Sequence, residues 1–584
     1  MPAEITHIEK KFMSDALLFE LGQKLCDRNF LSRSQLDELN SRCALTGDAL
    51  DGLLVKEAVV SEEEVLKILA ELSCIPFKHM ASITISTKAV EKVPPKLALQ
   101  YNAMPVELTD GTIVFAVSTV PDATAVDSMR ILLDSAVDWI LCTRSDISKS
   151  IKHFYGLGAG TIDQLEDPNR GVDTEIQGTD ISVESADEGI IKFVNQIIFE
   201  AIKMNATDIH IEPYENNLRL RYRVDGIMQT IPLPDKVRNF RKAIASCVKI
   251  MADLNIAEKR RPHDGRIKVR TAEDDFDLRV SILPTRFGET VNMRILNRAT
   301  MFIDLAHLGI RQEQLPQLEY FGSLPHGVVL LTGPTGSGKT TTLYALLSRI
   351  NTSEVKTITV EDPVEYQIEG INQIQVHSDI GLTFANILRS ILRHDPDIIL
   401  IGEIRDMETA DIAVRASLTG HLVFSTLHTN DAPSAITRLI DMGVEPFLVA
   451  SCLEGVIAQR LTRQICVACK EEMIPDEMLL TEIASTFPQR ALGAKYYKGH
   501  GCPECNFTGY RGRMALFEIM SLDEDIRQLI THLKSSNEIK KRAMEKGLVT
   551  LRKDGWSRVL NGTTSVEEVM RVTRRDEFPA IIND

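Results

Sequence analysis

A glycine-rich segment with one lysine is the clearest chemical signal in this 584-residue sequence. Residues 327–332 form an apolar, strand-like run that leads into GPTGSGKT and then a helix-like segment. This is G-x-x-x-x-G-K-[ST] in the strand–loop–helix context that it requires. Glycines let backbone N–H groups curl around a phosphate, and the helix N-terminus adds positive potential. The residues expected to bind nucleotide are Gly333, Pro334, Thr335, Gly336, Ser337, Gly338, Lys339, Thr340 and Thr341.

Two side chains of this loop have specific expected roles. Lys339 should reach the β- and γ-phosphates of a nucleotide, and the Thr340 hydroxyl should ligate Mg²⁺. The alternative is a glycine-rich turn that binds nothing. The strand, the Lys-Thr pair and the helix together argue against it.

A second apolar run, residues 398–401, ends in a carboxylate, Glu403. A P-loop ATPase needs an acid at such a strand end, to hold Mg²⁺ through water or to polarise the attacking water. Gly402 stands where many P-loop enzymes carry Asp. We therefore expect Glu403 to carry more of that work.

A third apolar run, residues 357–360, leads into three more acids, Glu361, Asp362 and Glu365. Acids gathered beside one phosphate site repel each other unless Mg²⁺ or Arg offsets them. Glu365 or Glu361 is the better candidate for the base that activates water. Taken alone, the segment also fits a solvated acidic turn.

Four cysteines form two C-x-x-C pairs, Cys466 with Cys469 and Cys502 with Cys505. Two such knuckles can bring four thiolates to one tetrahedral Zn²⁺. A closed four-sulfur site has no open coordination position, so we expect a structural zinc rather than a catalytic one. Disulfides are the alternative. The other cysteines are scattered and are expected to be small buried apolar residues.

The length suggests roughly three to four domains. The elements that position these groups accordingly fall into several segments. Hydrophobic periodicity predicts α/β and α+β units, with a β-then-α core around the phosphate loop. The expected boundaries are an N-terminal domain at 1–155, a Gly/Asp-rich linker at 156–185, an α+β domain at 186–303, the P-loop domain at 304–460, a tetracysteine region at 461–515 and a helical region at 516–584.

The first domain contains a faint internal repeat. The apolar pattern of residues 21–39 recurs at 50–68, with Ser32 and Ser61 at equivalent places. Each copy predicts helix, turn, Ser N-cap and helix. Two helical hairpins that only pack on each other would explain the whole pattern.

Composition narrows the class of protein. Lys and Arg total 66 against 82 Asp and Glu, a net charge of −16. Such a chain is a poor candidate for wrapping nucleic acid. No apolar run approaches the ~18 residues that span a bilayer, and the N-terminus has no signal-peptide pattern. We expect a cytoplasmic protein that is peripheral to the inner membrane through partners.

The motifs together resemble the secretion and pilus ATPases, which drive type II secretion and type IV pilus assembly. GPTGSGKTTT, EDPVEY, DPDIILIGEIRD and GHLVFSTLHTN are similar to that family's Walker A motif, Asp box, Walker B motif and His box, in the same order. The likeness covers residues 186–573. It implies a RecA-like P-loop core, a preceding PAS-like domain and a hexameric ring.

The resemblance also implies roles for arginines and histidines. In the family, two arginines of the preceding domain act as fingers on the phosphates, and the matching residues are Arg279 and Arg294. A fixed guanidinium offsets charge that develops on the γ-phosphoryl oxygens. His421 and His428 lie in the His box and are expected near the nucleotide, as hydrogen-bond donors rather than proton carriers. Weaker candidates for the same pocket are Arg221, Arg223 and Arg286.

The N-terminal repeat resembles the domain of assembly ATPases that in some members binds cyclic di-GMP. Leu21-Gly22 matches the tandem motif, but Asn29 replaces a Gly, and Glu57 and Ala58 occupy the second turn. Since Glu57 disfavours an anion, we do not expect cyclic di-GMP to bind. Docking on the cytoplasmic domain of a membrane protein is the better interpretation.

The expected function is therefore ATP hydrolysis in a homohexamer that moves a membrane platform protein, to which pilin or pseudopilin subunits add. The cysteine quartet resembles the assembly branch, so retraction is not expected. A nucleotide-gated scaffold and a DNA-uptake motor are the alternatives, although no basic arm for direct nucleic-acid binding is evident. Secretion and pilus assembly share every motif cited here.

Overall fold

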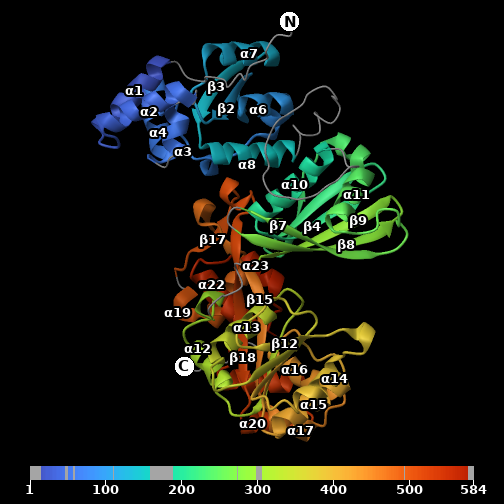
Figure 1. The fold of residues 1–584 in the computed structure, drawn as a ribbon. Helices are drawn as coiled ribbons and strands as arrows, with labels where there is room; N and C mark the ends of the chain where they lie inside the picture. The colour runs from blue at the N-terminus through green and yellow to red at the C-terminus, as the bar shows by residue number, and fades with distance from the viewer. Residues whose placement is uncertain are drawn as a thin grey trace. The chain divides into compact units, whose positions relative to one another are not determined.

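The computed structural model describes residues 15–46, 50–56, 59–109, 111–157, 188–271, 274–297, 305–491 and 493–576. Figure 1 traces the chain through its elements. The described residues divide into two compact units. The first comes from residues up to 269 with 277–296 and 500–509, and the second from 270–276, 297–499 and 510–576. Most of the expected linker, and Glu57 and Ala58, lie outside the described residues.

The second unit is built on a seven-stranded sheet in the order β12-β11-β13-β14-β10-β15-β18. The first six strands are parallel, and β18 runs antiparallel to β15. The strands expected around the P-loop and the Walker B carboxylate are confirmed. The bounds are β10 Gly327–Thr332, β11 Thr357–Glu361, β12 Asn372–Gln375, β13 Ile398–Ile401, β14 Leu422–Leu427, β15 Leu453–Ile465 and β18 Tyr510–Ser521.

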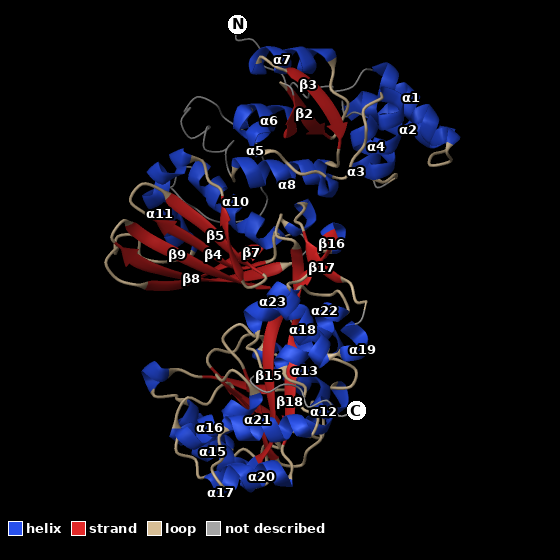
Figure 2. Cartoon of the chain, turned by 180° about the vertical axis from the view of Figure 1, so that it is seen from behind, coloured by secondary structure: helices blue, strands red, loops and turns tan. Residues whose placement is uncertain are grey.

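Helices cover both faces of this sheet, because its strands are apolar on both sides. Val328 and Leu330 pack in one core cluster, while the alternating Val329 and Leu331 pack in another. Figure 2 shows these strands among the helices of the unit. The helices are α12 Leu315–Gly322, α13 Lys339–Ile350, α14 Phe384–Ile391, α15 Met407–Leu418, α16 Ala432–Asp441, α17 Pro446–Cys452, α18 Glu477–Thr486, α19 Pro488–Ala491, α20 Glu524–Thr531, α21 Ser536–Glu545, α22 Leu551–Leu560 and α23 Val566–Val572.

The first unit begins with the repeat, and its helices are where the pattern placed them. Ser61 caps a helix by accepting the Glu64 N–H at 3.3 Å, and Ser32 accepts the Gln35 N–H at the same distance. A small sheet in the order β1-β2-β3 follows. The elements are α1 Asp15–Asp27, α2 Arg33–Thr46, α3 Leu50–Lys56, α4 Glu62–Ser73, α5 Thr87–Lys92, α6 Pro95–Tyr101, β1 Met104–Thr109, β2 Thr112–Val117, α7 Ala123–Leu133, β3 Ala136–Leu141 and α8 Arg144–Tyr155.

The α+β part of this unit is a six-stranded sheet in the order β6-β5-β4-β9-β8-β7. Its strands alternate between buried apolar and more exposed polar residues, the pattern of a sheet with one apolar face. Two helices with buried apolar stripes pack together beside it. The bounds are α10 Glu188–Lys203, β4 Ala206–Pro213, β5 Leu218–Val224, β6 Ile227–Ile231, α11 Arg241–Met251, β7 His263–Arg270, β8 Asp275–Thr285 and β9 Gly288–Asn297.

In the described part of the chain, no helix combines the length and apolarity that crossing a bilayer demands.

Candidate nucleotide and metal sites

The phosphate loop connects the end of β10 to the start of α13. Gly336 and Gly338 have φ of 78° and 88°, a region that glycine adopts without strain. A Cβ on Gly333 would lie 2.5 Å from the Gln459 carbonyl oxygen, so the neighbouring strand also requires a glycine at that position. The Ser337 hydroxyl is buried and has no hydrogen-bond partner among the described residues. The loop therefore offers a cradle and a spare donor for a phosphate.

Lys339 is folded back onto this loop. Its Nζ donates to the carbonyls of Gly333 at 2.8 Å and Pro334 at 3.1 Å. Burial lowers the pKa of Lys339 to about 8; Glu403 opposes this shift and Arg460 adds to it. The ammonium thus lies in a partly desolvated site where an anion would stabilise it.

Glu403 and His428 meet at the carboxyl edge of the sheet, because β13 and β14 are parallel neighbours. The His428 Nε2 lies 3.3 Å from the Glu403 Oε2, and Arg405 forms an ion pair with the same carboxylate. Burial alone would raise the pKa of Glu403, but Arg405 and His428 outweigh it and hold the pKa below its usual value. An ionised Glu403 is what the polarisation of water requires.

Packing explains why position 402 is a glycine rather than an aspartate. A Cβ there would lie 3.2 Å from the Val360 carbonyl oxygen and 3.3 Å from the Glu361 Cα. The close approach of β13 to β11 therefore leaves no easy room for an Asp at this position.

The acids at the end of β11 and just after it occupy different environments. Glu361 is buried and accepts hydrogen bonds from this chain's own side chains, whereas Asp362 is exposed and interacts electrostatically with Arg405. Glu365 is half-buried. The repulsion expected from the sequence is thus relieved by hydrogen bonds and by one arginine.

The start of the P-loop is tied to the end of the His box. The Thr332 and Thr429 hydroxyls are 2.6 Å apart, and the Thr429 N–H donates to the Thr332 Oγ1 at 2.8 Å. The Thr342 hydroxyl donates to the Gln459 Oε1 at 2.9 Å. Sequence reasoning missed Thr332, Thr429 and Gln459, because the order of the strands decides that they are neighbours.

His421 lies elsewhere. It precedes β14, whose first residue pairs with Gly327 at the start of β10, so it lies at the opposite edge from the P-loop. Its Nδ1 lies 2.9 Å from the Ala416 carbonyl oxygen. Of the two His-box histidines, this chain brings only His428 to the carboxylates.

The expected finger arginines lie on adjacent strands of the six-stranded sheet, Arg279 on β8 and Arg294 on β9. Each alternates with buried apolar residues, which places both on the polar face. The Arg294 Nε lies 3.1 Å from the Asp208 Oδ1, and the Arg223 Nε lies 3.5 Å from the Asp208 Oδ2. Asp208 is buried, so it orients the exposed Arg294 guanidinium. Arg221 instead pairs with Glu212 at 2.5 Å, and Arg286 lies over the Phe287 ring.

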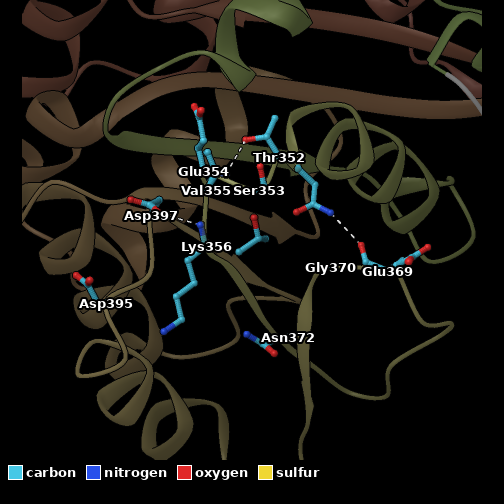
Figure 3. Close-up of a pocket in the computed structure, with 12 residues that line it drawn as sticks. Thr352, Ser353, Glu354, Val355, Lys356, Glu369, Gly370, Asn372, Asp395 and Asp397 are labelled. Carbon is cyan, nitrogen blue, oxygen red and sulfur yellow. Dashed lines mark hydrogen bonds between the residues drawn. The ribbon is translucent and has the colours of Figure 1, made fainter.

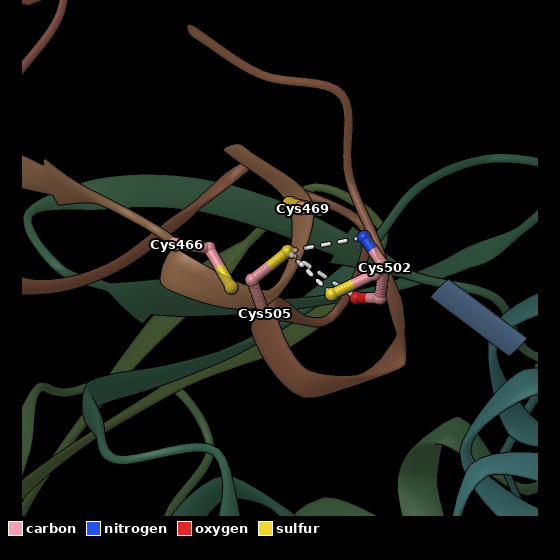
Figure 4. Close-up of side chains that lie close together, drawn as sticks. All are labelled: Cys466, Cys469, Cys502 and Cys505. Carbon is pink, nitrogen blue, oxygen red and sulfur yellow. Dashed lines mark hydrogen bonds between the residues drawn. The ribbon is translucent and has the colours of Figure 1, made fainter. Parts of the chain in front are cut away.

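The four cysteines form one buried cluster (Figure 4). Their sulfurs all lie within 4.8 Å of one another, and the Cys502 and Cys505 sulfurs are 3.8 Å apart. Tetrahedral Zn–S bonds of about 2.3 Å place sulfurs about 3.8 Å apart. None of the four forms a disulfide, so the donor set fits a metal ion.

A separate pocket of about 700 Å³ is lined by residues around the start of β11 (Figure 3). Its acidic side chains include Glu354, Asp395 and Asp397. Because the strands are parallel, it lies at the opposite edge from the phosphate loop. An acidic lining does not suit a nucleotide phosphate, so this pocket is distinct from the site described above.

The comparisons with known proteins agree with the motifs. Residues 183–571 match the family described as "Type II/IV secretion system protein", and residues 74–161 match the MshEN domain. The chain is 39% identical to the type IV pilus assembly ATPase PilB of Myxococcus xanthus (strain DK1622), over 96% of this chain and 99% of that protein. It is 40% identical to the type II secretion system protein E of Xanthomonas campestris pv. campestris, over 94% and 98% respectively. It is 47% identical to protein E of Pseudomonas aeruginosa, over 68% and 78%. The chain therefore belongs to the type II/IV secretion system protein family.

Proposed function

We propose that this chain hydrolyses ATP and that the hydrolysis drives the assembly of pilin or pseudopilin subunits, in type IV pilus biogenesis or type II secretion. One observation carries the proposal: the P-loop, Lys339 and an ionised Glu403 lie together at the carboxyl edge of the sheet. Two relatives that match this chain over nearly their full length support it, one named for type IV pilus assembly and the other for type II secretion.

In the proposed reaction, the P-loop amides and Lys339 hold the phosphates, and Thr340 with Glu403 would hold Mg²⁺. The ion would neutralise charge on the phosphate oxygens. Glu365 is the proposed base for the attacking water. His428 orients Glu403, and Arg279 and Arg294 offset charge on the γ-phosphoryl group.

The wider assembly is part of the same proposal. The chain forms a homohexamer in the cytoplasm, at the inner membrane, and contacts a platform protein there. The first domain docks on a membrane partner's cytoplasmic domain. One structural Zn²⁺ is held by Cys466, Cys469, Cys502 and Cys505.

Phosphate release by the purified full-length chain tests the proposal. Lys339→Ala and Glu403→Gln should each lower the rate at least about a hundredfold, because each removes transition-state stabilisation. Lys356→Ala and Glu354→Gln, at the opposite edge of the sheet, are matched controls and should retain the rate. A wild-type chain that binds ATP without releasing phosphate would favour the scaffold. Equal rates in all variants would contradict the assigned site.

A further inference from the structure

Tyr344 is a buried tyrosine on the P-loop helix with an unusual set of partners. It lies on α13, whose first residue is Lys339, and it is 1% exposed. Its hydroxyl donates to the Glu361 Oε2. Burial and the neighbouring Glu361 carboxylate raise the pKa of this phenol well above its usual value, so it stays protonated and keeps donating.

Both carboxylate oxygens of Glu361 accept hydrogen bonds from side chains of this chain. The Oε1 accepts the Thr359 hydroxyl at 2.6 Å and the Gln373 Nε2 at 3.2 Å, while Tyr344 occupies the Oε2. A buried carboxylate satisfied in this way is suited to anchoring rather than to taking a proton from water.

The same phenol also contacts the far end of the Asp box. The backbone N–H of Glu365 lies close enough to the Tyr344 phenol to act on its pKa, which it lowers as a donor would. The Tyr344 ring meets the Tyr366 ring edge-on, with centroids 4.5 Å apart. Gln373 closes the arrangement, since its Nε2 donates to the Tyr366 carbonyl at 3.0 Å. One side chain of the P-loop helix therefore holds the segment 361–366 at both ends.

We propose that Tyr344 is a positioning residue for hydrolysis: it sets the place of Glu365 relative to the phosphate loop by binding the Glu361 carboxylate and by packing against the Tyr366 ring, on either side of Glu365. The inference rests on the proposed function for its catalytic consequence. Catalytic groups must be held within about 0.5 Å of their productive place, and a shift of about 1 Å costs about a hundredfold in rate. A helix that begins at the phosphate loop is a rigid element through which Tyr344 can fix that position.

Tyr344→Phe tests the inference, because it removes only the hydroxyl and keeps the ring. The variant should lower kcat about tenfold to a hundredfold and leave KM for ATP within about twofold, since the phosphate-binding loop is unchanged. Tyr510→Phe, on β18, a strand that does not neighbour β10, is the matched control: it removes a tyrosine hydroxyl that lies 2.7 Å from the Ser565 Oγ. It should leave both constants unchanged.

Amide hydrogen exchange gives a readout that does not depend on turnover. The Glu365 amide should exchange about fivefold to tenfold faster in Tyr344→Phe than in the wild type, the factor that one hydrogen bond is worth. Gln373→Met removes another donor to Glu361 and should reproduce the fall in kcat. This variant replaces Tyr344→Phe in the test if Tyr344→Phe does not fold.

The outcomes separate the two proposals. Unchanged kcat and unchanged exchange at Glu365 in Tyr344→Phe would overturn the role of Tyr344 while leaving the ATPase assignment intact. A rise in KM equal to the fall in kcat would also overturn it. A wild-type chain without ATPase activity would overturn the proposed function, whereas faster exchange at Glu365 would still support the contact that positions the segment.

Discussion

Two residues that follow different strands, Arg405 and His428, lower the pKa of Glu403. Arg405 lies two positions along the chain, but His428 reaches Glu403 only because β14 is the neighbour of β13. The sequence motif was sufficient to predict Lys339 and Glu403. It could not predict the donors to Glu361, or that His421 lies at the opposite edge, because these follow from strand order and register rather than from local pattern.

The two finger arginines give a prediction at the residue scale. If the proposed mechanism holds, Arg279→Ala and Arg294→Ala should each lower kcat about a hundredfold to a thousandfold, because each would remove a cation that offsets developing phosphoryl charge. Nucleotide affinity should change less. Stopped-flow binding and phosphate release measure the two effects separately.

Arg219→Ala is the matched control, since the Arg219 guanidinium lies over the Tyr214 ring. A finger variant with the same rate as this control would remove Arg279 or Arg294 from the proposed mechanism.

At the scale of elements, the strands were the most predictable part of the chain. Continuous apolar runs such as residues 327–332 and 398–401 predicted strands, and both strands are present. The expected boundary at residue 460 was placed from motif positions, yet β15 continues to Ile465 and pairs with β18. Long-range pairing of this kind leaves no local signal, so the core sheet extends into the region that the cysteines suggested was separate.

Glu518 on β18 couples stability to pH. It is buried and accepts the N–H groups of Ala432 at 2.8 Å and Leu551 at 3.2 Å, which joins two helix starts to the strand. Burial raises the pKa of Glu518 to about 7, and the nearby Asp431 adds to this, while Lys540 opposes it. Between pH 4.5 and pH 7, Glu518 is therefore protonated in the folded state but ionised in the unfolded state, where its pKa is near 4.5.

The free energy of unfolding should then fall as the pH rises from about 4.5 to 7, by about 3 kcal/mol from this group. Glu518→Gln should lose that component of the pH dependence. Denaturant titrations of both chains at pH 5 and pH 8 measure it. An identical pH dependence in the two chains would show that Glu518 is not the group responsible.

The two C-x-x-C pairs predict that the stability of the surrounding region depends on a bound metal ion. One Zn²⁺ per chain should be found by elemental analysis, because four buried thiols at these separations match a tetrahedral site. Cys469→Ser should reduce the zinc content and lower the melting temperature of the region around β15 and β18. The exposed thiol variant Cys74→Ser is the control. Full stability and no zinc in the wild type would contradict a metal site.

At the scale of the whole molecule, one chain combines a helical repeat, a six-stranded sheet with arginines on its polar face, and a P-loop core. The length predicted several domains, and the motifs identified the family before the fold was known. In the proposed hexamer, nucleotide turnover would be passed between these parts through contacts between chains and with partners, which local sequence patterns do not predict. The function must therefore be tested in the assembled machine.

The most direct test is a native host whose only copy of this chain carries Lys339→Ala, compared with the wild type for surface pili and for secreted proteins in the same culture. The account predicts the loss of one output at wild-type protein levels: pili for a pilus assembly motor, or specific extracellular proteins for a type II secretion motor. Pili and secreted proteins that both remain at wild-type levels would contradict it.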